Sequence, residues 1–213
     1  MTIALLSSTF NSRLIAYRRL FIVAALTALV ASCATQPPPL PTPDQRLQTL
    51  DSWRMEGKLG FRSPEKNGSA WINWLQIKDS YQLQLSGPFG AAATRISGDS
   101  GHATLSQSGR DDIHAASGEE LSEWLFGWAF PVRQMSSWIK GAAAASPQPT
   151  ALVVSSENLL STLNQSGWQL TFSNYRQQGE WVLPGRIQGS QGDYAFTLII
   201  KQWDLSSRAA KTP

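Results

Sequence analysis

Apolar and polar side chains alternate along residues 52–63, SWRMEGKLGFRS. The apolar positions fall on one face of this segment and the charged positions on the other, which is the period of a strand with one buried side. The pattern returns in residues 69–77, after an Asn67-Gly68 pair that is typical of a hairpin turn. The sequence therefore predicts an antiparallel hairpin at the start of the folded region.

Short segments of the same kind continue along the rest of the chain, separated by glycines and prolines. They cover residues 80–87, 91–99, 102–107, 112–116, 150–155, 157–165, 167–175, 183–190 and 193–203. Connections this short favour antiparallel neighbours. We predict a strongly curved antiparallel sheet, mainly β in class, with two or three helices inserted in the middle of the chain.

The first predicted helix lies in the segment SGEELSEWLFGW, where the apolar period changes from two to about 3.6. Ser117 and Glu120, three residues apart, form a capping box that marks its start. Its apolar side chains stand at i, i+3, i+4 and i+7. These are Leu121, Trp124, Leu125 and Trp128.

A second amphipathic segment, FPVRQMSSWIKG, follows at once. Pro131 suits the first turn of a helix, and Gly141 suits its end. Val132, Met135 and Ile139 share one face between them. We expect the two helices to pack on the apolar face of the sheet as a small lid.

Two short helices are a small cover for the apolar face of about ten strands. Large apolar side chains, nine tryptophans among them, are available to fill the space. Two interpretations stay open: an ordinary packed core, or a partly filled cavity that accepts lipid. The residues expected to form the lid and cavity are Leu121, Trp124, Leu125, Trp128, Met135, Ile139, Trp74, Leu83 and Leu85.

The N-terminal residues have the pattern of an export signal. Arginines precede a short apolar run that ends in LVASC, so residues 1–32 are predicted to be a signal peptide. The small residues before Cys33 resemble a bacterial lipobox, whose cysteine is lipidated. Ala34 stands where Asp is usually linked to retention in the inner membrane, so the outer membrane is favoured.

Proline-rich sequence follows Cys33 and shows no hydrophobic period. Such sequence prefers an extended path and builds no core, so residues 33–50 are predicted to be a tether. A single domain is expected over residues 51–205, and the small polar residues 206–213 form a tail that frays.

The charge of the chain adds little to the inference about function. The chain carries 18 basic and 15 acidic residues, and three of the basic residues lie in the predicted signal, which leaves the two signs in balance. A balanced domain gives no indication of a nucleic-acid partner.

Candidate catalytic groups are scarce. Cys33 is the only cysteine, so an internal disulfide is excluded. His102 and His114 are too few for a three-ligand zinc site unless carboxylates join them. The chain contains no G-x-S-x-G motif, no P-loop and no dinucleotide fingerprint. We therefore expect no enzymatic activity, no metal and no cofactor.

One apolar residue has no structural reason for its position. Phe89 stands in the turn Gly87-Pro88-Phe89-Gly90, where the glycines and proline suit the backbone. A phenylalanine ring at the tip of a hairpin gains nothing from water. Either the turn folds back under another segment, or Phe89 meets an apolar partner.

Taken in order, three segments resemble the LolB family of outer-membrane lipoproteins. They are GPFG after an alternating strand, the helical GEELSEWLFGWAFPVRQMSSWIKG, and the closing IIKQWDL. The resemblance extends from Trp53 to Leu205. It implies an open antiparallel half-barrel of about eleven strands with a small helical lid over an apolar cavity.

The family resemblance also implies a function. The protein is expected to accept lipoproteins from the periplasmic carrier LolA and to insert them into the outer membrane. Pro88, Phe89 and Gly90 then form the membrane-insertion loop, with Phe89 where the family usually has leucine, and Cys33 carries the lipid anchor. The expected partners are LolA, lipoprotein acyl chains and outer-membrane lipids, and we expect a monomer at the periplasmic face.

Two alternatives stay open beside this function. The first is a structural or scaffold lipoprotein whose core is full. The second is a lipid-modifying enzyme that uses Asp, Glu and His side chains.

Overall fold

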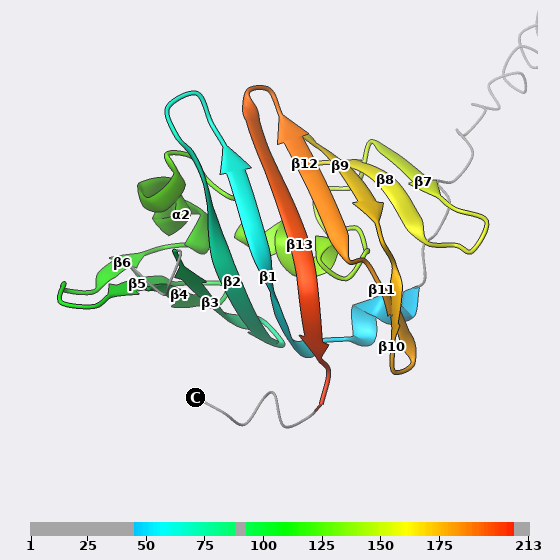
Figure 1. The fold of residues 1–213 in the computed structure, drawn as a ribbon, viewed down its shortest axis with the longest axis horizontal. Coiled ribbons are helices and arrows are strands. Elements are labelled where there is room, and N and C mark those ends of the chain that lie inside the picture. The colour runs from blue at the N-terminus through cyan, green and yellow to red at the C-terminus, as the bar shows by residue number, and fades with distance from the viewer. Residues whose placement is uncertain (1–44, 88–92, 207–213) are drawn as a thin grey trace, which may run out of the picture. The chain divides into compact units, whose positions relative to one another are not determined.

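A computed structural model describes residues 45–87 and 93–206 of the chain. Its main feature is an eleven-stranded antiparallel sheet with the order β6-β5-β4-β3-β2-β1-β13-β12-β9-β8-β7 (Figure 1). The first six strands are β1 (Ser52–Arg62), β2 (Asn67–Ile77), β3 (Ser80–Ser86), β4 (Thr94–Gly98), β5 (Ala103–Gln107) and β6 (Ile113–Ala115). The others are β7 (Ala151–Val154), β8 (Leu160–Gln165), β9 (Trp168–Ser173), β12 (Arg186–Gln191) and β13 (Tyr194–Asp204).

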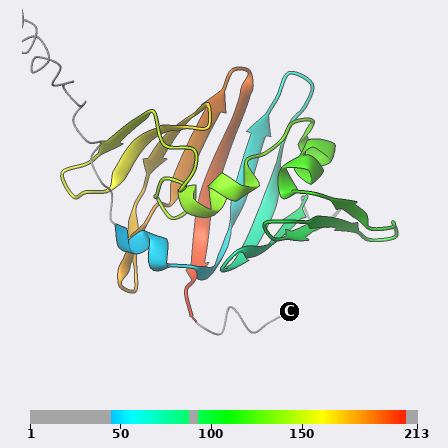
Figure 2. The ribbon, with the colours of Figure 1, turned by 180° about the vertical axis from the view of Figure 1, so that it is seen from behind.

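β6 and β7 are the two edges of this sheet, so the sheet is open, as predicted. The strands before the helices form one half and the strands after them the other, and β1 and β13 join the halves in the middle. Both helices lie on one face of the sheet, as the two opposite views show (Figures 1 and 2). We call this the inner face and the opposite one the outer face.

Alternation along β1 explains how the central strand is oriented. Trp53, Met55 and Leu59 are fully buried on the inner face, while Lys58 is exposed on the outer face. The turn after β1 differs from the prediction, because Asn67 and Gly68 already pair with β1 as strand residues. The turn is instead closed by Ser63, whose amide donates to the Lys66 carbonyl and whose hydroxyl accepts from the Lys66 amide.

The two predicted helices are present. α2 spans Gly118–Phe126, and the Glu120 amide donates to the Ser117 hydroxyl at its N-cap, as the capping box predicts. Gly127 ends α2 in the left-handed conformation, with φ at 78°. α3 spans Val132–Trp138, with Pro131 at its N-cap, and Gly141 follows in the left-handed conformation.

Three short elements were not expected from the sequence. η1, a 3-10 helix at Gln45–Thr49, precedes β1, and β10 (Arg176–Gln178) pairs with β11 (Trp181–Leu183) in a separate two-stranded sheet. The predicted tether is therefore too long at its inner end, because Leu47 and Leu50 belong to the buried core. Their side chains bury apolar area against the domain, which an extended tether cannot do.

Candidate functional site

The inner face of the sheet carries a continuous cluster of aromatic rings. Trp128 lies at its centre, with ring centroids 5.4 Å from Phe130, 5.3 Å from Trp168 and 5.7 Å from Tyr194. Phe130 is in turn 5.4 Å from Phe196 on β13. The link between α2 and α3 thus inserts two aromatic side chains between the lid and the sheet.

A second aromatic group covers the inner face near the start of β1. The Trp53 ring lies 6.0 Å from that of Trp74 and 5.5 Å from that of Trp203. Trp74 also approaches Tyr81, at 6.5 Å. Centroid distances of this size are those of favourable offset and edge-to-face pairs. Tight packing of large rings therefore occupies both ends of the inner face.

Most of the residues predicted to form the lid and cavity lie together between the helices and the sheet. Buried in one core cluster are Trp74, Leu83, Leu85, Leu121, Trp128, Met135 and Ile139, while Leu125 is half-buried against it. Of the two interpretations left open by the sequence, the packed core describes the inner face in this conformation.

The inward placement of Trp124 is wrong, since its side chain is 69% exposed. The buried arc of α2 is set by Leu121, Ser122 and Phe126, and Trp124 lies just beyond its edge at 100° per residue. Trp128 was predicted on the same helical stripe. It is buried for another reason, because α2 ends at Phe126 and the loop carries Trp128 inward.

α3 is fastened to the sheet by Gln165, a residue that the sequence pattern did not single out. Its side chain is 1% exposed and lies at the end of β8. Gln165 Oε1 accepts from Trp138 Nε1 at 2.8 Å and from the Ala144 amide at 2.9 Å. Gln165 Nε2 donates to the carbonyls of Ala144 and Pro147, at 2.8 and 2.6 Å. One buried side-chain amide thereby forms four hydrogen bonds around the C-terminal end of α3.

Lys140 makes a further attachment after α3. Its Nζ donates to the Leu50 carbonyl at 2.8 Å, and the side chain is 6% exposed. Gln48 Nε2 donates to the Ala143 carbonyl at 3.3 Å beside it. Burial lowers the pKa of Lys140 to about 8, and the nearby Asp51 carboxylate partly offsets this shift. The segment after α3 is thus joined to the residues that enter the domain before β1.

α2 is attached through one buried hydroxyl, that of Ser122, and one exposed side chain, that of Lys66. The Ser122 hydroxyl donates to the Glu119 carbonyl and accepts from the Phe130 amide, both at 2.7 Å. At its C-terminal end, Lys66 Nζ donates to the Leu125 carbonyl at 2.6 Å, through an exposed side chain. A positive group at this position also suits the negative end of the helix dipole.

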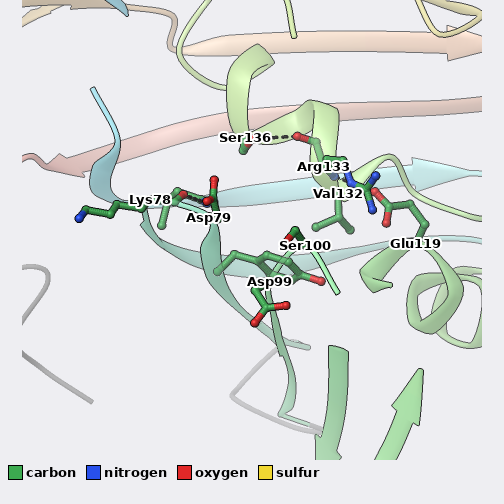
Figure 3. Close-up of a pocket in the computed structure, with 10 residues that line it drawn as sticks. Lys78, Asp79, Asp99, Ser100, Glu119, Val132, Arg133 and Ser136 are labelled. Atoms are coloured by element: carbon green, nitrogen blue, oxygen red, sulfur yellow. Dashed lines mark hydrogen bonds between the residues drawn. The ribbon is translucent and has the colours of Figure 1, made fainter. Parts of the chain in front are cut away.

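A cavity of about 180 Å³ opens where α2 and α3 meet the turns after β2 and β4 (Figure 3). Charged and hydroxyl side chains surround much of it, while Val132 and Tyr81 contribute apolar surface. The Arg133 amide donates to Glu119 Oε1 at 2.7 Å across the two helices. Burial and the Glu119 charge raise the pKa of Tyr81 to about 12. The cavity is smaller than the ~300–1,000 Å³ of typical ligand sites.

The family to which the chain belongs follows from its match to a known protein family. A family model described as "Outer membrane lipoprotein LolB" matches residues 51–203, which is well over half of the chain. The chain belongs to the LolB family.

Two relatives of known family agree with the family match. The chain is 42% identical over 199 residues to the outer-membrane lipoprotein LolB of Cellvibrio japonicus, covering 89% of this chain and 98% of that protein. It is 35% identical over 198 residues to LolB of Pseudomonas fluorescens, covering 88% and 96%. A solved structure of a LolA superfamily protein from Nitrosomonas europaea aligns with a TM-score of 0.49 at 8% identity, covering 78% and 94%.

Several residues predicted for the LolB function lie outside the described residues. These are Cys33 and the three loop residues Pro88, Phe89 and Gly90. Within residues 45–87 and 93–206, no helix is long and apolar enough to cross a membrane, and no three His, Cys, Asp or Glu side chains are placed to hold a metal ion.

Proposed function

We propose that the chain accepts lipoproteins from the periplasmic carrier LolA and inserts them into the outer membrane. In this role it is a monomer at the periplasmic face, anchored by a lipid on Cys33, and it catalyses no reaction. One observation carries the proposal: in a chain of the LolB family, a lid of two helices covers the apolar face of an open sheet.

The chemistry of acyl chains explains why such a face is needed. Burying one CH₂ group is worth about 0.8 kcal/mol, so a sixteen-carbon chain resists water by roughly 12 kcal/mol. A lipoprotein crossing the periplasm therefore needs an apolar surface at each stage. Without a nucleotide-binding motif, transfer runs down a gradient of affinity. The chain binds acyl groups more tightly than LolA does and less tightly than the bilayer.

Entry of cargo requires the lid to move. The inner face is packed with rings in this conformation, and the cavity beside Tyr81 holds only about 180 Å³. Displacing the link that carries Trp128 and Phe130 opens the aromatic surface beneath it. Met135 and the aromatic side chains make adaptable contacts, which suit a site that must release what it binds.

Insertion is assigned to Pro88, Phe89 and Gly90, between β3 and β4. Phe89 supplies an apolar ring whose partner is the bilayer, which accounts for its place in a glycine- and proline-rich turn. The substitution of Phe for the usual leucine keeps the apolar character of the loop.

The packed inner face also favours a second candidate function, a scaffold lipoprotein with a full core. The two candidates differ in a transfer experiment. The Cys33→Ala chain is mixed with LolA that carries a fluorescent lipoprotein, and vesicles are then added. Label that moves from LolA to this chain and on to the vesicles supports the receptor. Label that stays on LolA supports the scaffold.

Phe89 is tested in the same assay with a matched pair of variants. Phe89→Glu is expected to lower delivery to vesicles more than tenfold while the chain still accepts label from LolA, because a carboxylate at the bilayer is costly. Phe89→Leu keeps delivery near the parent level. Equal delivery by the two variants would exclude Phe89 from the insertion step.

A further inference from the structure

Trp71 is a large apolar side chain on the outer face of the sheet, away from the lid. It is 51% exposed, and Trp124 and Val153 are the other large apolar side chains with comparable exposure within residues 45–87 and 93–206. The next inward residues of β2, Ile72 and Trp74, are buried, so alternation directs Trp71 outward. An indole left half in water has apolar area available for a partner.

Strand register places Trp71 in a row of side chains that crosses five strands. Trp71 pairs with Lys58 on β1 and with Ser86 on β3. Lys58 pairs with Ile199, which pairs with Arg186. We call these residues the Trp71 row: Arg186, Ile199, Lys58, Trp71 and Ser86. The row combines two cations with two apolar side chains and contains no carboxylate.

The next two outer-face rows toward the β1–β2 turn carry small and polar residues and Arg62. Gly60 pairs with Ser69 and Thr197, and the next row has Arg62 opposite Asn67 and Ala195. On the other side of the Trp71 row, Glu56 stands across from Asn73, whose Nδ2 donates to Glu56 Oε1 at 2.9 Å. The two rows toward the turn add one cation, Arg62, and no carboxylate, while Glu65 and Asp193 stand in the turns beyond them.

A groove of about 320 Å³ runs beside Trp71. Its lining includes Asn73, Gln84, Ser86 and Lys201, and also the Glu56 carboxylate, which accepts from Asn73 Nδ2. Amide, hydroxyl and ammonium groups in such a groove can hydrogen-bond to phosphate and glycerol oxygens.

Trp124 shows that exposure alone does not define this surface. It lies on α2, whose other exposed positions include the carboxylates Glu120 and Glu123. An anionic surface would be repelled there, whereas it is attracted to Lys58 and Arg186 around Trp71. The two exposed tryptophans thus suit different partners.

We propose that the Trp71 row is a contact surface for an anionic phospholipid bilayer, distinct from the insertion loop. The indole of Trp71 lies at the level of the headgroups, where tryptophan is enriched in membrane proteins. Lys58 and Arg186 pair with lipid phosphates on either side of it. This inference rests on the proposed function, because it needs the chain to work at a membrane surface.

The test follows a fluorescent probe on the lipidated full chain in vesicles of phosphatidylethanolamine and phosphatidylglycerol. Trp71→Cys, Trp124→Cys and Val153→Cys each introduce one reactive thiol, since Cys33 is the only native cysteine and carries the lipid. A quencher is attached to the acyl chains of the lipid. The probe at position 71 is expected to be quenched several-fold more than the probes at 124 and 153. Equal quenching at 71 and 153 would overturn the proposal.

Charge is tested in the Cys33→Ala chain by sedimentation with vesicles. Lys58→Gln is expected to weaken binding to phosphatidylglycerol vesicles about fivefold, the effect of one cation near an anionic surface. Binding to phosphatidylcholine vesicles is expected not to change. Lys78→Gln, in the turn between β2 and β3, is the matched control. Equal loss with both variants would contradict a surface centred on Trp71.

The same lipidated preparations separate this inference from the proposed function. Acceptance of lipoprotein from LolA with no selective quenching at position 71 would overturn the bilayer surface alone. Selective quenching without acceptance of lipoprotein would support the surface and overturn the receptor function.

Discussion

α2 and α3 cover the same apolar face, yet different contacts hold them there. α3 buries Val132, Met135 and Trp138 almost completely, and Gln165 and Lys140 fasten its C-terminal side with buried hydrogen bonds. α2 packs on β4, β5 and β6, which are short strands at one edge of the sheet, and leaves Trp124 in water. Deeply buried hydrogen bonds hold the C-terminal side of α3, whereas an exposed lysine holds the C-terminal end of α2, so we expect the lid to open first at that end of α2.

Removal of the Trp138 side chain is expected to have the largest effect on stability, and it tests whether α3 is the more firmly held helix. Trp138 is fully buried, so Trp138→Ala is expected to lower the free energy of unfolding by about 3–5 kcal/mol through the cavity it leaves. Trp124→Ala, on α2, is expected to change it by less than about 0.5 kcal/mol. Urea unfolding of the two variants measures both effects. Similar losses would remove the distinction between the helices.

Gln165→Leu tests the polar part of the same attachment. The substitution keeps the volume but leaves Trp138 Nε1 and the Ala144 amide without their acceptor inside the core. We expect a loss of about 3 kcal/mol, since each buried unsatisfied group costs ~1–3 kcal/mol. Gln177→Leu, on the exposed β10–β11 hairpin, is the control. A cost below 1 kcal/mol for Gln165→Leu would mean that apolar packing alone holds α3.

Lys140 gives the α3 attachment a dependence on pH. The folded pKa of about 8 lies below the value of about 10.4 for an unfolded lysine, so the unfolded chain binds more protons between these values. The stability of the parent relative to Lys140→Met is therefore expected to rise by about 2 kcal/mol from pH 7 to pH 9.5. Urea unfolding at both pH values measures the difference. A pH-independent difference would show that Lys140 titrates normally.

Patterns local in sequence predicted much of the fold. Alternation in residues 52–63 gave the inward face of β1, and Ser117 with Glu120 gave the start of α2, because these signals need only neighbouring residues. The resemblance to the LolB family supplied the open sheet and the lid. None of these signals indicated how firmly each helix is held.

The attachments of the lid depend on contacts between distant segments. Gln165 is a polar residue at the end of a strand, and only the fold brings it under Trp138. Lys140 resembles any basic residue near a helix end until its contact with Leu50 is known. The Trp71 row likewise requires the register of five strands. Trp124 was misplaced because helical spacing alone did not reveal that Ser122 and Phe126 complete the buried arc.

The smallest expected change in stability concerns the C-terminal end of α2. Lys66→Ala removes the hydrogen bond from Lys66 Nζ to the Leu125 carbonyl, which an exposed side chain makes, so the free energy of unfolding should change by no more than about 0.5 kcal/mol. Local opening is expected to respond more strongly. Hydrogen exchange at the amides of α2 should accelerate several-fold, while the amides of α3 keep the parent rates.

Lys58→Ala, on the outer face, is the control for losing a cation elsewhere in the same hairpin. Unchanged exchange in α2 after Lys66→Ala would mean that the exposed bond does not restrain the helix. Equal acceleration in α2 and α3 would mean that the lid moves as one unit. Acceleration confined to α2, together with faster acceptance of lipoprotein from LolA, would identify the α2 end as the side from which acyl chains enter.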